Sequence, residues 1–308
     1  MQSFKLTYRA GKLLREKGIL AVAKAAFHYF RPLRAASWPA LRGEMSGRDV
    51  IEVGGPSSIF SHRGILPVYT VAQSVDNCTF SPNTIWSENT EPGDTFSYCK
   101  GKANGYQFFG EASQLSNIIN RPYECLISSH VIEHLANPIA ALNDWKNALT
   151  ENGLLLLVVP HKEGTFDHKR STTAIDHLIE DFVNDTGEDD LTHLDEILNY
   201  HDFTKDPGAK SVEEFAVQAR ANLAVRGLHH HVFTAPLVAQ MLDYSNYQIE
   251  SIELLSPLHI VVVARSLPAE SGRANNSEYL TVDANYLKLS PFSSDKFDAQ
   301  KFDAVHGG

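Results

Sequence analysis

Between residues 49 and 265 the sequence alternates short apolar runs with longer amphipathic segments, and this alternation is the feature that most constrains the fold. It is typical of a mostly parallel β-sheet whose strands are joined by crossover helices. Strands are expected at residues 49–53, 68–75, 123–128, 154–159, 247–255 and 259–265. Only residues 256–258 separate the last two segments, which is too few for a parallel crossover, so these strands are expected to form an antiparallel hairpin. The sequence therefore predicts an α/β fold with a mostly parallel sheet that ends in a hairpin.

Capping residues mark the start of two helices. Asn137 followed by Pro138 begins the first, which is expected to end before Gly153, and Thr234 followed by Ala235-Pro236 begins the second. The side chains expected to face the core are Ile139, Leu142, Trp145 and Leu149 in the first helix and Leu237, Val238, Met241 and Leu242 in the second.

Charge and composition divide the chain into three parts. Residues 1–45 hold nine Lys or Arg and two Glu, and basic and apolar residues alternate there at helical spacing. This basic helical extension is expected either to cap the core or to contact an anionic membrane surface or a partner protein. Residues 46–268 are expected to form the main domain. Residues 269–308 are rich in Ser, Asn and Asp and are expected to form a poorly packed or partner-dependent polar tail.

Several classes of protein are disfavoured by composition. No apolar run reaches the eighteen residues of a membrane span and residues 1–30 lack a secretory signal, so a cytoplasmic location is expected. Cys78, Cys99 and Cys125 have no metal-ligand or disulfide spacing. Residues 176–214 carry 13 Asp or Glu against two Lys, an acidic surface that repels phosphates, so nucleic acid is not expected as a substrate.

Glycine and acidic residues follow the first predicted strand, at the sheet edge where open α/β folds bind ligands. Glu52 supplies a hydrogen-bond acceptor, and Gly54 and Gly55 allow the backbone to approach a ligand closely. Positions 56 and 59 are not glycine, so the loop is not expected to cradle a pyrophosphate. An ordinary strand-to-helix turn is the alternative interpretation of this segment.

Two further acidic residues are expected at the same edge. Asp76 lies 24 residues after Glu52, a spacing at which a carboxylate meets a ribose in nucleotide-binding α/β folds. Glu111, with the backbone of Ala112, is placed to face an adenine edge. Each of these residues alone is more often a solvated loop residue, but their recurrence after successive strands favours a binding site.

Residues 128–138, which read SSHVIEHLANP, resemble the segment after the fourth strand of class I S-adenosylmethionine-dependent methyltransferases, particularly the type 11 and type 23 groups. The glycine loop, the acidic residues and HHHVFTAPL at 229–237 extend the similarity over roughly residues 49–265. The resemblance implies a Rossmann-like class I methyltransferase fold and S-adenosylmethionine as cofactor. It further implies that Glu52, Gly54 and Gly55 surround the methionine part, Asp76 binds the ribose, Glu111 and Ala112 lie by the adenine, and Ser129 and His130 lie near the sulfonium.

About 85 residues separate the predicted strand at 154–159 from the predicted hairpin. Residues 161–231 are therefore expected to form an acidic lid over the strand ends. A neutral imidazole there would suit the acceptance of a proton from a hydroxyl substrate. His161 is the first catalytic candidate, and His229 and His231 are the next, because they share one face if the segment is extended. A structural role is the alternative for each histidine.

Metal binding by the same region is not predicted. Imidazoles together with Asp167, Asp202 or Asp206 offer ligands for a divalent ion, but no spacing among them is diagnostic of a metal site.

The favoured function is O-methylation of a sugar, a glycan precursor or another hydroxylated small molecule. It follows from the acidic, histidine-rich lid and from similarity to methyltransferases of bacterial polysaccharide clusters. N-methylation of a small amine is the first alternative, because an acidic lid suits a cationic substrate. The second is a non-catalytic binding or scaffold protein, since Pro56 and Ser58 stand where the related loops carry glycine.

Overall fold

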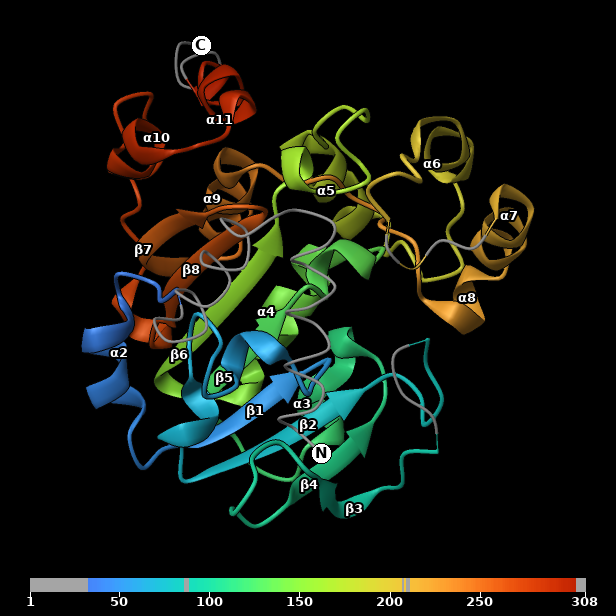
Figure 1. Ribbon diagram of the computed structural model, residues 1–308. Helices are drawn as coiled ribbons and strands as arrows, with labels where there is room; N and C mark the ends of the chain where they lie inside the picture. Colours follow the sequence, from blue (N-terminus) through green and yellow to red (C-terminus); the bar gives the residue numbers. More distant parts are fainter. Residues whose placement is uncertain (1–32, 86–88, 207, 209–210, 303–308) are drawn as a thin grey trace, which may run out of the picture.

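The computed structural model describes residues 33–85, 89–206, 208 and 211–302 (Figure 1). The expected N-terminal helices, and with them any membrane or partner contact of that segment, fall mainly on residues 1–32, outside the described residues. The last part of the basic extension is described and contains helix α2 (Trp38–Met45). Within the described part of the chain, no helix combines the length and apolar character needed to cross a membrane.

Eight strands form one mixed sheet (Figure 1). They are β1 (Asp49–Val53), β2 (Ser74–Thr79), β3 (Gly93–Phe96), β4 (Gly105–Phe109), β5 (Tyr123–Ser129), β6 (Leu149–Pro160), β7 (Tyr247–Leu255) and β8 (His259–Ser266). In space they follow the order β3-β4-β2-β1-β5-β6-β8-β7. The strands from β4 to β6 in this order are parallel, whereas β8 is antiparallel to both β6 and β7. The predicted α/β fold, with a mostly parallel sheet and a final hairpin, is confirmed.

Helices cover the faces and the carboxyl edge of this sheet. The remaining α-helices are α3 (Leu115–Ile118), α4 (Pro138–Ala148), α5 (Ile175–Val183), α6 (Leu194–Tyr200), α7 (Val212–Arg220), α8 (Asn222–Val225), α9 (Ala235–Tyr244), α10 (Asn285–Leu289) and α11 (Ser293–Ala299). Short 3-10 turns are η1 (Ser58–Phe60), η2 (Val68–Thr70), η3 (Ala112–Gln114), η4 (Ile132–His134), η5 (Lys162–Gly164) and η6 (Ala269–Ser271).

Strand β6 shows how the sheet is buried on both faces. Leu155, Leu157 and Val159 belong to the larger core cluster, which includes α4 and α9. The alternate residues, Leu154, Leu156 and Val158, belong to a second cluster with α2 and the loop at 59–72. Side chains of a strand alternate between faces, so a continuous apolar run fills both cores, as expected for a central strand of a parallel sheet.

Both predicted helix starts are found. The Asn137 side chain accepts a hydrogen bond from the backbone N–H of Ala140 at 3.0 Å, which caps α4. Leu149 already begins β6, so the helix ends earlier than the predicted break at Gly153. Thr234 precedes α9 as predicted, but its hydroxyl donates to Asp298 at 3.0 Å instead of capping the helix.

The prediction for the second strand is wrong. Residues 68–70 form the turn η2, and the strand itself is Ser74–Thr79. The apolar side chains that suggested a strand, Val68, Tyr69 and Ala72, are buried because this loop packs in the second core cluster. Strands β3 and β4 were not predicted, since both are short; β3 has two exposed polar residues, and β4 exposes Tyr106.

The expectation of a poorly packed C-terminal tail is also wrong for residues 269–302. The apolar residues of this segment that join the larger core cluster are Ala284, Tyr286, Leu287, Ala299 and Phe302. Asp295 is fully buried and accepts a hydrogen bond at 2.8 Å from the backbone N–H of Ala235, at the start of α9. A carboxylate is favourable at a helix N-terminus, so a residue that reads as polar tail stabilises the core.

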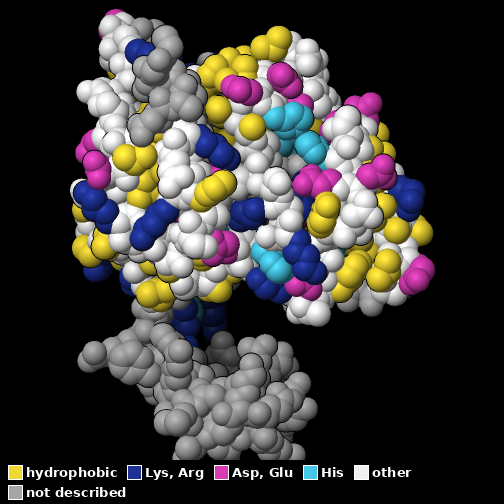
Figure 2. Space-filling model, turned by 90° about the horizontal axis from the view of Figure 1, so that it is seen from above, with side chains coloured by type: hydrophobic (Ala, Val, Ile, Leu, Met, Phe, Trp, Pro, Cys, Tyr) yellow, Lys and Arg dark blue, Asp and Glu magenta, His cyan; other side chains and the backbone are white. Residues whose placement is uncertain are grey.

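The segment between β6 and α9 carries helices α5 to α8, and we refer to it as the lid. Helices α6 to α8 lie together on the side to which the parallel strands β1 and β2 point (Figure 1). Ile197 of α6, Ala219 of α7 and Leu228, which follows α8, form a small apolar cluster of their own. Asp and Glu side chains are spread over the face seen in Figure 2, and histidine side chains reach the surface among them.

Candidate active site

Two cavities meet at the carboxyl ends of the central strands. The core cavity, of about 430 Å³, lies over β1, β2, β4 and β5, and the lid cavity, of about 620 Å³, lies under the lid. His130 and His134 line both. The core cavity is at the switch point of the sheet, where β2 and β5 leave β1 on opposite sides. Open α/β sheets bind their ligands at this position.

The loop after β1 forms one wall of the core cavity. Gly54 has φ +84°, and its N–H donates to the carbonyl of Cys78 at 2.9 Å. A Cβ atom at Gly54 would lie 2.3 Å from a methyl carbon of Val131. The Gly55 N–H donates to the side-chain oxygen of Asn77 at 2.9 Å. Positive φ and close packing explain the glycine at 54, and both predicted glycines line the cavity.

Glu52 supports this loop from inside the core and does not line the core cavity, which corrects the expectation that it points toward the ligand. Its carboxyl group accepts hydrogen bonds from the Ser57 N–H at 3.0 Å and the Tyr69 hydroxyl at 2.6 Å. Burial raises the pKa of Glu52 to about 8, although both hydrogen bonds act in the opposite direction. Its side chain therefore fixes the shape of the loop.

The prediction that Asp76 lies at a strand end is wrong. Its carboxylate accepts from the Tyr106 N–H at 2.7 Å and from the Tyr123 hydroxyl at 2.6 Å. Tyr123 is the first residue of β5, so Asp76 faces the amino-terminal part of the sheet and is absent from the lining of the core cavity. The cause is the late start of β2, whose carboxyl end is Thr79.

The other four predicted cofactor residues, Glu111, Ala112, Ser129 and His130, line the core cavity. The Ala112 carbonyl accepts from the indole N–H of Trp145 at 2.8 Å, which holds the turn after β4 in place. Burial lowers the pKa of His130 to about 3, so its ring is neutral. A cation bound beside it meets no positive charge on this side chain.

Arg226 is a site residue that the sequence did not indicate. From the lid it donates to Glu111 at 2.7 Å and forms an ion pair with Glu188 at 2.7 Å. Its guanidinium also lies over the Phe80 ring, 5.3 Å from the ring centre. Arg226 thus ties the lid to the turn that follows β4. Its charge gave no signal, because residues 161–231 carry six other Lys or Arg.

His229 and Asp167 form a buried pair at the lid cavity. His229 lines the cavity, and its Nδ1 lies 2.5 Å from a carboxylate oxygen of Asp167. Burial acts to lower the pKa of His229, but the charge and hydrogen bond of Asp167 outweigh it and raise the pKa above its usual value. Arg170 donates to the other oxygen of Asp167 at 3.0 Å. The pair can therefore accept and hold a proton.

Glu133 lies in the same cavity. It is buried, and its Oε2 has no hydrogen-bond partner among the described atoms. Burial raises the pKa of Glu133 to about 7. Glu133, His134 and His229 bring one ligand atom each within 4.8 Å of one another, so this trio could also hold a metal ion. The sequence had not indicated it, because His229 is far from the other two residues in the chain.

The structure contradicts the catalytic prediction for His161. The ring is fully buried, stacks on Phe292 with 3.8 Å between ring centres, and lies 3.1 Å from Asp295 through Nε2. Its Nδ1 accepts from the Glu163 N–H at 3.2 Å. Both ring nitrogens are therefore engaged by the protein, and His161 lines neither cavity.

His231 does not act with His229 as predicted. Residues 229–231 are not part of a strand, so the alternation expected of an extended segment does not apply. The Nε2 atom of His231 meets the carbonyl oxygen of Ala136 at 3.0 Å, and the residue lines neither cavity.

Comparison with known proteins assigns the chain to a family. The sequence model of a methyltransferase domain family matches residues 25–252, and the chain belongs to this family. Solved structures to which the chain is similar include S-adenosylmethionine-dependent methyltransferases from three organisms. They are those of Mesorhizobium loti (15% identity, 75% of this chain and 98% of that chain, TM-score 0.43), Methanosarcina mazei (13%, 76% and 99%, 0.42) and Aquifex aeolicus (12%, 74% and 89%, 0.40). No curated protein matches the chain.

The chain is therefore an S-adenosylmethionine-dependent methyltransferase, and an enzyme is favoured over a non-catalytic scaffold. The core cavity fits the cofactor in two respects. Its volume is within the usual range for small-molecule sites, and its histidines are neutral, while the charge of Glu111 is offset by Arg226 in the same lining. S-adenosylmethionine carries no phosphate, so Pro56 and Ser58 in place of glycines do not exclude it.

Proposed function

We propose that the protein methylates a hydroxyl group of a sugar, a glycan precursor or another hydroxylated small molecule, with His229 as the general base. The observation that carries the proposal is the buried His229–Asp167 pair at the lid cavity, which adjoins the core cavity through His130 and His134. In this arrangement Gly54, Gly55, Glu111, Ala112, Ser129 and His130 hold S-adenosylmethionine, and the acceptor lies under the lid. Bound S-adenosylmethionine supplies an electrophilic methyl group.

Asp167 determines which nitrogen of His229 is available. Because Nδ1 faces Asp167, Nε2 is left to accept the proton of an acceptor hydroxyl. The carboxylate stabilises the imidazolium that forms, and Arg170 holds the carboxylate in place. The remaining contribution to the rate is orientation of the acceptor in the lid cavity.

The lining of the lid cavity supports a sugar-like acceptor. Polar side chains that can bind hydroxyl groups stand beside aromatic rings, which can pack against the apolar face of a sugar. They are Glu133, His201, Lys205, Asp206, Glu214 and Gln218, with Phe166 and Phe215.

N-methylation of a small amine is the second candidate. The observation that favours it is the presence of three carboxyl groups, those of Glu133, Asp206 and Glu214, in the lining of the lid cavity. A protonated amine would bind there, but it must lose its proton before it accepts a methyl group, and His229 could take that proton as well.

The test is a screen of sugars, glycan precursors and small amines with isotope-labelled S-adenosylmethionine, read by mass spectrometry. We expect label in an ether of a hydroxylated acceptor. His229→Ala should lower this rate by about 10²–10⁴-fold, whereas His168→Ala, a lid substitution outside both cavities, should leave it unchanged. Label found only in amines would replace the proposal with the second candidate.

A further inference from the structure

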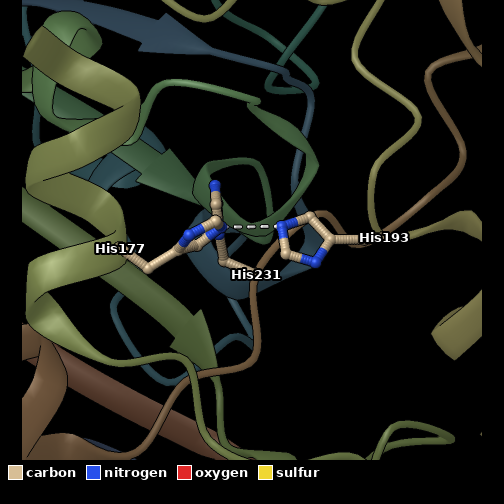
Figure 3. Close-up of side chains that lie close together, drawn as sticks. All are labelled: His177, His193 and His231. Carbon is tan, nitrogen blue, oxygen red and sulfur yellow. Dashed lines mark hydrogen bonds between the residues drawn. The ribbon is translucent and has the colours of Figure 1, made fainter. Parts of the chain in front are cut away.

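Three histidines converge at a place that belongs to neither cavity (Figure 3). His177 lies on α5, His193 is the residue before α6, and His231 lies in the segment that leads into α9. Each offers one ring nitrogen, and the three nitrogens lie within 4.8 Å of one another. Two parts of the lid and the segment before a core helix therefore meet through imidazole rings.

The separation of the first two rings is close to that of two ligands on one ion. The Nε2 atoms of His177 and His193 are 2.9 Å apart. Two nitrogens bound to one tetrahedral zinc ion are about 3.3 Å apart, given Zn–N bonds of about 2.0–2.1 Å. A small widening of the pair would therefore admit the ion.

His231 is held in the manner of a ligand. It is 1% exposed, and its Nε2 meets the Ala136 carbonyl oxygen at 3.0 Å, while its Nδ1 has no hydrogen-bond partner among the described atoms. Metal-binding histidines commonly donate their other ring N–H to a backbone carbonyl, which fixes the tautomer and the ring orientation.

Asp181 offers a fourth ligand. Its Oδ2 is buried without a hydrogen-bond partner in the described part of the chain. That oxygen lies 3.4 Å from His177 Nε2, the same nitrogen that faces His193. The other carboxylate oxygen accepts from the Thr186 hydroxyl at 3.0 Å, which orients the group.

We propose that His177, His193 and His231, with Asp181, bind one divalent transition-metal ion, of which zinc is the representative. Three imidazoles and a carboxylate are ligands that zinc accepts in a tetrahedral site. The ion would join α5 and α6 to the segment before α9, and so fasten the lid to the core. The site is independent of the methyl acceptor, because its residues line neither cavity.

The experiment uses the full chain, freed of metal with a chelator and titrated with zinc chloride. Calorimetry and elemental analysis should give one zinc ion per chain. At a zinc concentration of 100 Kd, the Tm should rise by roughly 5 °C. His177→Ala and His193→Ala should each weaken zinc binding by more than the ~10–100-fold typical of losing an outer partner of a metal ligand.

Two matched variants serve as controls. His168→Ala removes a lid histidine that is paired with Asp202 outside the cluster, and His229→Ala disrupts the other trio of potential ligands. Both should keep one zinc ion with unchanged affinity. The proposal is overturned if the unmodified chain binds no zinc or if His177→Ala and His193→Ala bind it normally. Loss of zinc in His229→Ala alone would place the ion in the lid cavity instead.

Discussion

His229 and His231 are two positions apart, yet their surroundings give them different chemistry. His229 lines a cavity and contacts Asp167, whose charge raises its pKa. His231 is enclosed by His177 and His193 and by the carbonyl of Ala136, and burial lowers its pKa. One ring is suited to taking up a proton and the other to staying neutral. The difference comes from the partners that the fold brings to each ring. Three consecutive histidines in the sequence do not indicate these partners.

The largest expected effect is a difference in kcat between a variant of His229 and a variant of His231. With the acceptor found by the screen, His229→Ala should lower kcat by about 10²–10⁴-fold, because the general base is lost. His231→Ala should lower it by less than tenfold. Binding of S-adenosylmethionine, measured by calorimetry, should change little in His229→Ala, since this residue does not line the core cavity. Equal losses of kcat in the two variants would contradict the distinction.

A second test measures the burial of Glu133 beside His229. The pKa of Glu133 is raised to about 7 in the folded protein. At pH values between the ordinary pKa of a glutamate and 7, the folded state therefore holds a proton on this group that the unfolded state has lost. Stability from this group is therefore present at low pH and is lost as the pH rises through 7, by about 3 kcal/mol in total.

Glu133→Gln should remove this loss. Urea unfolding at pH 5 and pH 8 should show a smaller decrease in the free energy of unfolding for the variant than for the unmodified protein. Glu52 contributes a similar dependence to both proteins, so the difference between them isolates Glu133. An identical decrease in both would show that Glu133 is solvated in the folded state.

The pH dependence of kcat/KM should sharpen the role assigned to Asp167. Activity should rise with pH as His229 loses its proton, with an apparent pKa above the usual histidine value. Asp167→Asn should move this apparent pKa downward and lower the maximum rate, because the neutral amide no longer favours the imidazolium. A profile that does not move in Asp167→Asn would remove His229 as the titrating group.

The smallest effect on turnover is expected from a substitution in the proposed zinc site, which consists of His177, His193, His231 and Asp181. His193→Ala should keep kcat within about threefold, because this ring takes no part in proton transfer. Its Tm should fall, and the lid should be cut faster by a protease at limiting concentration. A loss of turnover as large as that in His229→Ala would mean that the two histidine groups are parts of one site.

Much of the sheet was predictable because its central strands are buried on both faces. The apolar run that forms β6 and the hairpin of β7 and β8 fixed the fold class directly. Strand β2 was misplaced because Val68, Tyr69 and Ala72 are buried by a loop, and burial of a loop produces the same apolar signal as a strand. The wrong position of Asp76 followed from that error.

The site was predictable where it depends on local sequence. Gly54 and Gly55 follow β1, Ser129 ends β5 and His130 follows it, and all four line the core cavity. The pairing of His229 with Asp167 joins residues 62 positions apart, and no local pattern encodes it. The same is true of Arg226 with Glu111, which are 115 positions apart.

The contacts of Asp295 also affect the order in which the chain can fold during its synthesis. This carboxylate caps α9 and contacts His161, residues 60 and 134 positions earlier in the chain. A ribosome adds residues in order. His161, after β6, and Ala235, at the start of α9, therefore lack their contact with Asp295 until α11 has left the exit tunnel. The carboxyl edge of the sheet can therefore be completed only late in synthesis. In a chain that stops before Asp295, the N-terminus of α9 lacks this hydrogen-bond acceptor and the Nε2 atom of His161 lacks its carboxylate partner.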